Sequence, residues 1–350
     1  MMEYQKKNRK EDNRALLESE LRAFLGDNPK IPLNPFVQLV KDYSELELCF
    51  RGNSESSPRI SIYSNNHVIF SVFTTGKIVI SFNHARYCEK WERYFETLTK
   101  EYGFNGSKNK TNDKGDIDVG EMTRSLKYNK PLTYPQVRAL YETVLKPMFG
   151  EYFEAEGKSD VVDYFKHGVL VKAAGKKEKR RQQEIYRKFI STSNGYFFYD
   201  LEFAQRHENK KAQIEDKSNN KPDMQAIRFD SNGKPEKIVF VEVKCTDAAM
   251  KGASGLEEHL KKMKAYAKLE DRRKEACQIM NQYAKLGLRG LSNTDMFDYE
   301  DFARLELEIL LVFTDDAIGL WENSSKFADD RKLAKKINYA DDPNICLYRI

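Results

Sequence analysis

A carboxylate and an ammonium group share one face of a short apolar segment, residues 237–245 (KIVFVEVKC). Side chains alternate between the two faces of a strand, so Glu242 and Lys244 point to the side opposite Val241 and Val243. Charged groups at the end of an apolar strand are costly to bury unless they are paired or bind a ligand. The pattern therefore makes Glu242 and Lys244 candidates for a site that does chemistry.

A second carboxylate, Asp223, stands at the start of the preceding apolar segment. The turn sequence at 230–233 (DSNG) predicts a β-hairpin, which would place Asp223 next to Glu242 at the far end from the turn. Two carboxylates about 4 Å apart repel by roughly 4 kcal/mol at the effective dielectric near a protein surface, and one lysine offsets only part of that. A divalent cation removes the repulsion, and carboxylate, water and phosphate oxygens are the ligands that Mg²⁺ prefers.

Two carboxylates and a lysine around Mg²⁺ favour phosphodiester hydrolysis. Such a metal generates hydroxide from water near neutral pH and neutralises charge on the phosphoryl transition state. Lys244 would orient or deprotonate the water, or stabilise the pentavalent phosphorus. We expect Mn²⁺ to substitute for Mg²⁺ in this chemistry.

The elements that must position these residues follow a definite order. Hydrophobic periodicity and turn residues predict a helix, three strands, a long helical stretch and a further strand. Their expected ranges are 178–190, 195–205, 221–230, 237–245, 255–286 and 305–314. This order predicts an α/β domain in the second half of the chain.

Pro222-Asp223, followed after eighteen residues by Glu242-Val243-Lys244, resembles the PD-(D/E)xK, or restriction-endonuclease-like, nuclease superfamily. The resemblance covers residues 176–316. It implies a mixed sheet flanked by helices and a Mg²⁺-dependent deoxyribonuclease or endonuclease with a role in defence, restriction or repair. It also implies that Asp223, Glu242 and the backbone carbonyl of Val243 bind the metal, and that Lys244 is the catalytic lysine.

Two more acids compete to complete the site that the resemblance implies. In many members of the superfamily an acid on the first helix does so, and Glu184 is the match here, although it could equally be a solvent-facing glutamate. Glu202, on the same strand face as Asp200, is the other candidate because a carboxylate is out of place in the apolar segment FFYDLEFA. It could instead lie behind the metal ligands, contact substrate or face solvent at a sheet edge.

Basic residues near the site predict contact with a phosphate backbone, which is non-specific and sensitive to salt. A RecB-type branch of the superfamily carries a glutamine followed four residues later by tyrosine, and this chain has Lys262 and Tyr266 at those positions. The lysine departs from that branch but suits a phosphate, as would the exposed positions Lys261, Lys264 and Lys268. The main expected contact is a basic run at the start of the first helix, and a solvated helix face is its alternative. This run comprises Lys176, Lys177, Lys179, Arg180 and Arg181.

Composition limits the class of protein. The 350 residues include 59 basic and 54 acidic ones, a net charge of +5 that is too balanced to establish a polyanionic partner by itself. No apolar segment approaches the roughly 20 residues that span a bilayer, and the first residues do not resemble a secretory signal. The five cysteines form no CxxC pair, which excludes a zinc finger and fits a reducing compartment. We therefore expect a cytoplasmic protein.

The chain is expected to form two domains, residues 1–150 and 151–350. Four short alternating segments within 45–83 predict an antiparallel meander in an N-terminal α+β recognition or assembly domain. Helices are expected at about 10–25, 89–102 and 134–146, and exposed loops at 105–118 and 206–220. Residues 151–350 would form the nuclease-like domain.

Two other functions remain open from the sequence. One is a nucleic-acid-binding or assembly protein that keeps the fold without catalysis. The other is an RNA-directed nuclease, since the meander carries aromatic side chains that could stack on bases, although packing in the core is their commoner use. These are Phe50, Tyr63, Phe70, Phe73 and Phe82. Because one metal site cuts one strand, double-strand cleavage would require a homodimer or a second event.

Overall fold

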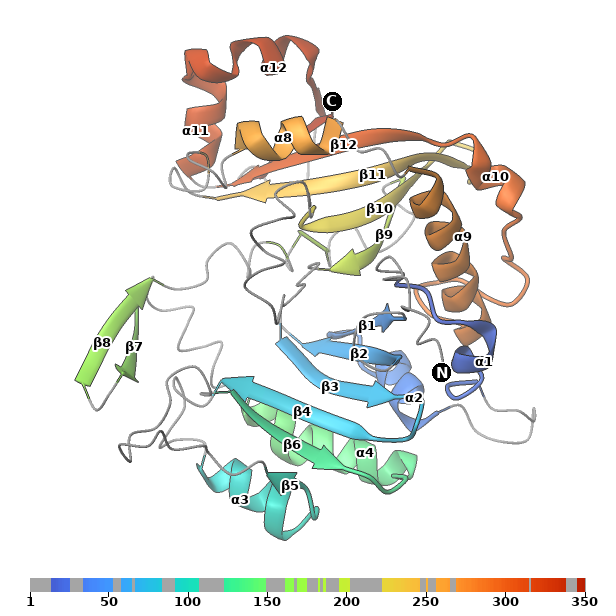
Figure 1. The fold of residues 1–350 in the computed structure, drawn as a ribbon, viewed down its shortest axis with the longest axis vertical. Coiled ribbons are helices and arrows are strands. Elements are labelled where there is room, and N and C mark those ends of the chain that lie inside the picture. Colours follow the sequence, from blue (N-terminus) through green and yellow to red (C-terminus); the bar gives the residue numbers. More distant parts are fainter. Residues whose placement is uncertain are drawn as a thin grey trace, which may run out of the picture. The chain divides into compact units, whose positions relative to one another are not determined.

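The structure is a computed structural model that describes seventeen segments of the chain. They are residues 14–25, 34–52, 58–64, 67–83, 92–106, 123–148, 161–166, 169–174, 182, 185–186, 195–201, 222–245, 250, 256–264, 269–314, 316–337 and 345–349. The protein is mixed α/β (Figure 1) and divides into two compact units, residues 1–176 and 177–350. This boundary lies later than the one expected after residue 150. No helix in the described segments is long and apolar enough to cross a membrane.

The first unit is built on a six-stranded antiparallel sheet with the order β1-β2-β3-β4-β6-β5. Its strands are β1 (Leu46–Arg51), β2 (Arg59–Ser64), β3 (His67–Phe73), β4 (Ile78–Asn83), β5 (Asn105–Gly106) and β6 (Thr123–Tyr128). The expected meander is confirmed by the consecutive pairing of β1 to β4. The loop expected at 105–118 begins instead as β5, which pairs with β6, and its residues 107–118 lie outside the described segments.

The described part of this unit also contains helices, and the second of them packs on β1. They are α1 (Glu18–Leu21), α2 (Pro35–Asp42), α3 (Glu92–Lys100) and α4 (Tyr134–Leu140), which continues as a π turn (Tyr141–Leu145). Phe36 of α2 packs edge to face on Phe70, with ring centroids 5.0 Å apart. Phe50 and Phe70 are buried, so these two aromatic side chains pack in the core, which is their commoner role. Phe73 is half-buried and lies beneath the cations of Arg59 and Lys77.

The first helix is shorter than the expected 10–25. Among the described residues of that range only α1 is helical. The carboxylate of Glu20 accepts the backbone N–H of Leu17 at 2.7 Å and so fixes the start of the helix there. The carbonyl of Arg14 accepts the N–H of Gly52 at 3.0 Å, which holds the preceding residues beside the end of β1. A separate hairpin, β7 (Val161–Lys166) and β8 (Val169–Ala174), completes this unit and was not predicted.

The second unit contains a six-stranded mixed sheet with the order β13-β14-β12-β11-β10-β9. Its strands are β9 (Tyr196–Leu201), β10 (Met224–Phe229), β11 (Pro235–Lys244), β12 (Glu306–Thr314), β13 (Lys335–Ile337) and β14 (Ile345–Arg349). Its longer helices are α8 (Leu256–Lys264), α9 (Leu269–Leu286), α11 (Asp316–Asn323) and α12 (Ala328–Leu333), with a short α10 (Tyr299–Ala303). The four strands expected between 195 and 314 are confirmed. Of the helix expected at 178–190, three residues are described and helical.

The predicted hairpin is confirmed by antiparallel pairing of β10 and β11, with Met224 opposite Val241. Its turn is closed by Asp230, whose carboxylate accepts the backbone N–H groups of Asn232 and Lys234 at 2.8 and 2.9 Å. Gly233 has a φ of +76°, a conformation that glycine adopts without steric cost. β11 also pairs in parallel with β12. A parallel pair requires a long crossover, which the helices α8 to α10 provide.

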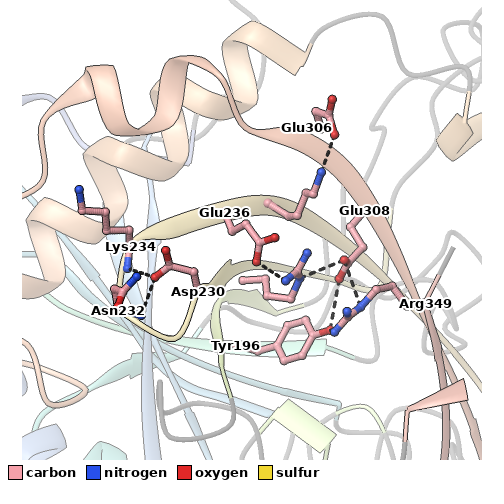
Figure 2. A network of polar contacts seen from close by, with 10 residues as sticks. Tyr196, Asp230, Asn232, Lys234, Glu236, Glu306, Glu308 and Arg349 are labelled. Carbon is pink, nitrogen blue, oxygen red and sulfur yellow. Dashed lines mark hydrogen bonds and ion pairs between the residues drawn. The ribbon is translucent and has the colours of Figure 1, made fainter. Parts of the chain in front are cut away.

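A buried polar network joins four strands of this sheet (Figure 2). Glu308 of β12 accepts a hydrogen bond from Nε of Arg228 at 3.0 Å and lies 3.1 Å from Nε of Arg349. The hydroxyl of Tyr196 donates to the same carboxylate at 3.2 Å. Burial, together with the negative charge of Glu308, raises the pKa of Tyr196 to about 12, so this hydroxyl keeps its proton. Glu308 is in register with Val239, so the network lies on the face of the sheet opposite Glu242.

Glu308→Ala is expected to lower the free energy of unfolding by about 3 kcal/mol, because it leaves the charges of Arg228 and Arg349 without their buried partner. Urea unfolding of the whole protein measures this change. Glu306→Ala is the matched control on the same strand: Glu306 pairs with Lys237 at 2.5 Å but is 76% exposed, so its loss should cost about 0.5 kcal/mol or less. Equal effects of the two substitutions would show that the network does not stabilise the sheet.

Candidate active site

The site forms at the carboxyl end of β11, a strand that lies between β10 and β12. Glu242 and Lys244 are 1% and 3% exposed, and Nζ of Lys244 lies 2.7 Å from Oε1 of Glu242. The two side chains therefore share one face, as the alternation along the strand predicts. Their neighbours in register on β12 are Leu311 and Phe313, so apolar groups flank the charged pair on that side. In such surroundings, each buried charge would be costly in free energy without the opposite charge beside it.

Asp223 immediately precedes β10 and reaches across the hairpin. Its Oδ2 accepts the backbone N–H of Val243 at 2.8 Å, which fixes this carboxylate beside the residue that follows Glu242. The side chain of Val243 is buried on the opposite face of the sheet. Its backbone carbonyl is the group that the superfamily resemblance assigns to the metal. The hairpin thus brings Asp223 to the end of β11 that carries Glu242 and Lys244, as the sequence predicts.

His259 of α8 is a further member of the site that the sequence analysis missed. Its Nδ1 lies 2.5 Å from Oε1 of Glu242, and its side chain is 24% exposed. A signal for it was present in the sequence. His259 lies at helical spacing with Leu256, Leu260 and Met263, which form the buried face of α8. A histidine on the apolar face of the helix after the ExK strand could have been considered as a partner for Glu242.

The two oxygens of the Glu242 carboxylate have different surroundings. Oε1 contacts both Lys244 and His259. Oε2 is buried and has no hydrogen-bond partner among the described residues. A buried, unsatisfied oxygen on an ionised group costs free energy, and a bound cation would remove that cost. The donor set of carboxylates and a backbone carbonyl also fits a hard cation such as Mg²⁺.

The described part of the chain supplies only some of the ligands that a Mg²⁺ site needs. It contains no group of three or more His, Cys, Asp or Glu side chains arranged to hold a metal. Asp223 and Glu242 would therefore be joined by water, by phosphate oxygens or by residues outside the described segments. Asp200, which is 2% exposed, is the cross-strand neighbour of Gln225 and lies on the same sheet face as Glu242.

Several predicted residues lie outside the described segments. They are Lys176, Lys177, Lys179, Arg180, Arg181, Glu184, Glu202, Tyr266 and Lys268, together with the loop expected at 206–220. The backbone of Lys262 is part of α8, but its side chain is not described. The competition between Glu184 and Glu202 and the role of the basic run at the start of the first helix therefore remain predictions.

The basic surface expected along α8 is partly neutralised. Nζ of Lys264 lies 2.8 Å from Asp330 of α12, so this lysine already has an acidic partner. Glu257 of the same helix pairs with Lys326 at 3.0 Å. Lys261 is exposed. These ion pairs connect α8 to the segment that follows α11 and leave less positive charge for a phosphate backbone than the sequence suggested.

Comparisons with known proteins give no relative for this chain: no protein-family profile, curated protein or solved structure matches it. Any assignment of function therefore depends on the residues and the geometry described above.

Proposed function

We propose that this protein is a Mg²⁺-dependent nuclease that hydrolyses phosphodiester bonds of DNA, with a core of the PD-(D/E)xK type in residues 176–316. The observation that carries the proposal is the state of Glu242. One oxygen of its carboxylate contacts Lys244 and His259, while the other is buried without a hydrogen-bond partner among the described residues. This arrangement suits a carboxylate that binds a cation through its second oxygen.

Each residue of the site would have a distinct role in catalysis. Asp223 and Glu242 would hold the Mg²⁺, with the backbone carbonyl of Val243 as a further ligand. The metal would supply an activated water and neutralise charge on the phosphate. Lys244, whose ammonium lies beside Glu242, would place a positive charge next to the scissile phosphate and orient the attacking water. The apolar neighbours on β12 limit the access of bulk water to these charges and so strengthen their interactions.

DNA is preferred over RNA as the substrate because of the superfamily resemblance. A role in defence, restriction or repair rests on the same resemblance. The alternative of a binding protein without catalysis is less favoured, since both carboxylates and the lysine of the motif are present together and none has been replaced. A homodimer would be needed for concerted cleavage of both strands.

Wild-type protein is expected to cleave plasmid and linear duplex DNA with Mg²⁺ or Mn²⁺ and to be inactive in chelator, with activity restored when metal is added back. Parallel reactions with RNA of matched sequence and length compare the two substrate classes, and a metal-free binding assay measures affinity separately from cleavage. Cleavage that persists in chelator would contradict the metal site. DNA binding without cleavage in either metal would favour the non-catalytic alternative, and faster cleavage of the RNA would favour an RNA-directed nuclease.

A further inference from the structure

Two donors from different parts of the chain converge on one oxygen of Glu242. Lys244 comes from the same strand, two residues further along. His259 comes from the helix α8, which follows β11 in the chain. The final torsion of a glutamate side chain is broad and is not fixed by rotamer preference. A second contact from outside the strand therefore restricts the plane of the carboxylate in a way that Lys244 alone would not.

The helix that carries His259 is held firmly. Leu256, Leu260 and Met263 are buried along one face of α8. Two surface ion pairs, Glu257 with Lys326 and Lys264 with Asp330, also link it to the segment that follows α11. Because α8 is anchored by its buried apolar face, the imidazole ring has a defined direction. An ionised carboxylate only accepts hydrogen bonds, so Nδ1 of His259 carries the proton in this contact.

We propose that His259 is a positioning residue, which holds Oε1 of Glu242 so that Oε2 is presented to the metal. This inference rests on the proposed function, because it assigns His259 a part in the same site. His259 would not ligate the cation through Nδ1, since that atom is engaged by Glu242. When a group that hydrogen-bonds to a metal ligand and orients it is lost, metal affinity typically falls by about 10-fold to 100-fold.

Three substitutions test this role, because they differ in where they place a donor. The amide nitrogen of asparagine reaches about as far from the backbone as Nδ1 of histidine, whereas that of glutamine lies farther out, near the position of Nε2. His259→Asn should therefore retain the contact with Glu242. His259→Gln and His259→Ala should lose it. Lys274→Ala, at an exposed position of α9, is the control.

Titration of the metal-free protein with Mn²⁺ by calorimetry gives the decisive measurement. His259→Ala and His259→Gln are expected to weaken Mn²⁺ binding by about tenfold, while His259→Asn and Lys274→Ala stay within about threefold of wild type. Circular dichroism before each titration shows that the variant is folded. In cleavage assays the same two weak variants should need about tenfold more Mn²⁺ for half-maximal rate and approach the wild-type rate when metal is saturating.

Two results would overturn the inference. The first is a wild-type protein that binds Mn²⁺ and an alanine variant that binds it equally well. The second is an asparagine variant as weak as the alanine variant, which would mean that the ring acts through its bulk. Both differ from failure of the proposed function itself, in which the wild-type protein neither binds Mn²⁺ nor cleaves nucleic acid.

Discussion

Replacement of Lys244 by glutamine is expected to lower the rate of DNA cleavage by about 10²-fold to 10³-fold, the cost of losing one preorganised electrostatic group at a transition state. The amide can still donate a hydrogen bond to Oε1 of Glu242, so the buried site keeps its satisfied oxygen. It cannot supply the positive charge next to the phosphate. Single-turnover rates at saturating Mg²⁺ measure the effect on the chemical step.

Lys237→Gln is the matched control for this substitution. Lys237 lies on the same strand at the opposite end and pairs with the exposed Glu306. Its replacement should leave the cleavage rate within about twofold, because surface ion pairs contribute little. Lys244→Ala is a second test, in which the rate should fall at least as far and the protein should also lose stability, since Glu242 loses one of its two contacts among the described residues. A glutamine variant that cleaves at the wild-type rate would remove Lys244 from the mechanism.

Replacement of Asp223 by asparagine is expected to abolish most metal binding and, with it, cleavage. The asparagine oxygen can still accept the N–H of Val243, so the hairpin should keep its geometry. What is lost is one of the two negative charges that would hold the cation. We expect Mn²⁺ affinity to fall by more than about a hundredfold, beyond the usual effect of groups that only orient a ligand. Calorimetry with Mn²⁺ and single-turnover cleavage measure the two losses.

Asp230→Asn is the matched control for Asp223→Asn. Asp230 is on the same hairpin, in the turn at the other end, and the side-chain oxygen of asparagine can accept the same two backbone N–H groups. This variant should bind metal and cleave DNA as the wild type does. If Asp223→Asn behaved like Asp230→Asn in both measurements, the metal would have to be held by other residues.

The central hairpin could be predicted because its signals are local. The DSNG turn and the period-two alternation of 237–245 determine which ends of the strands meet and which side chains share a face. Structure and sequence agree there: the hairpin forms, and Glu242 and Lys244 share one face, where their side chains are in contact. Asp223 is likewise placed beside β11, through the N–H of Val243.

His259 could not be placed in the same way, because its contact with Glu242 depends on how α8 packs on the sheet. That packing is set by the parallel pairing of β11 with β12, which are more than sixty residues apart in the chain. The short strands β5, β6, β13 and β14 were also missed. Sequences such as TRSLKY of β6 and KKI of β13 carry too few alternating apolar residues to predict a strand.

The double pairing of β11 restricts how this site can change by insertion or deletion. An extra residue between 237 and 242 would turn Glu242 and Lys244 to the other side of the sheet, unless β10 and β12 both re-paired at the same time. The loop of residues 231–234 lies at the far end, where added length need not disturb either ladder. Within this hairpin, length variation among any homologues that keep the activity should therefore fall in that loop and be absent from β11.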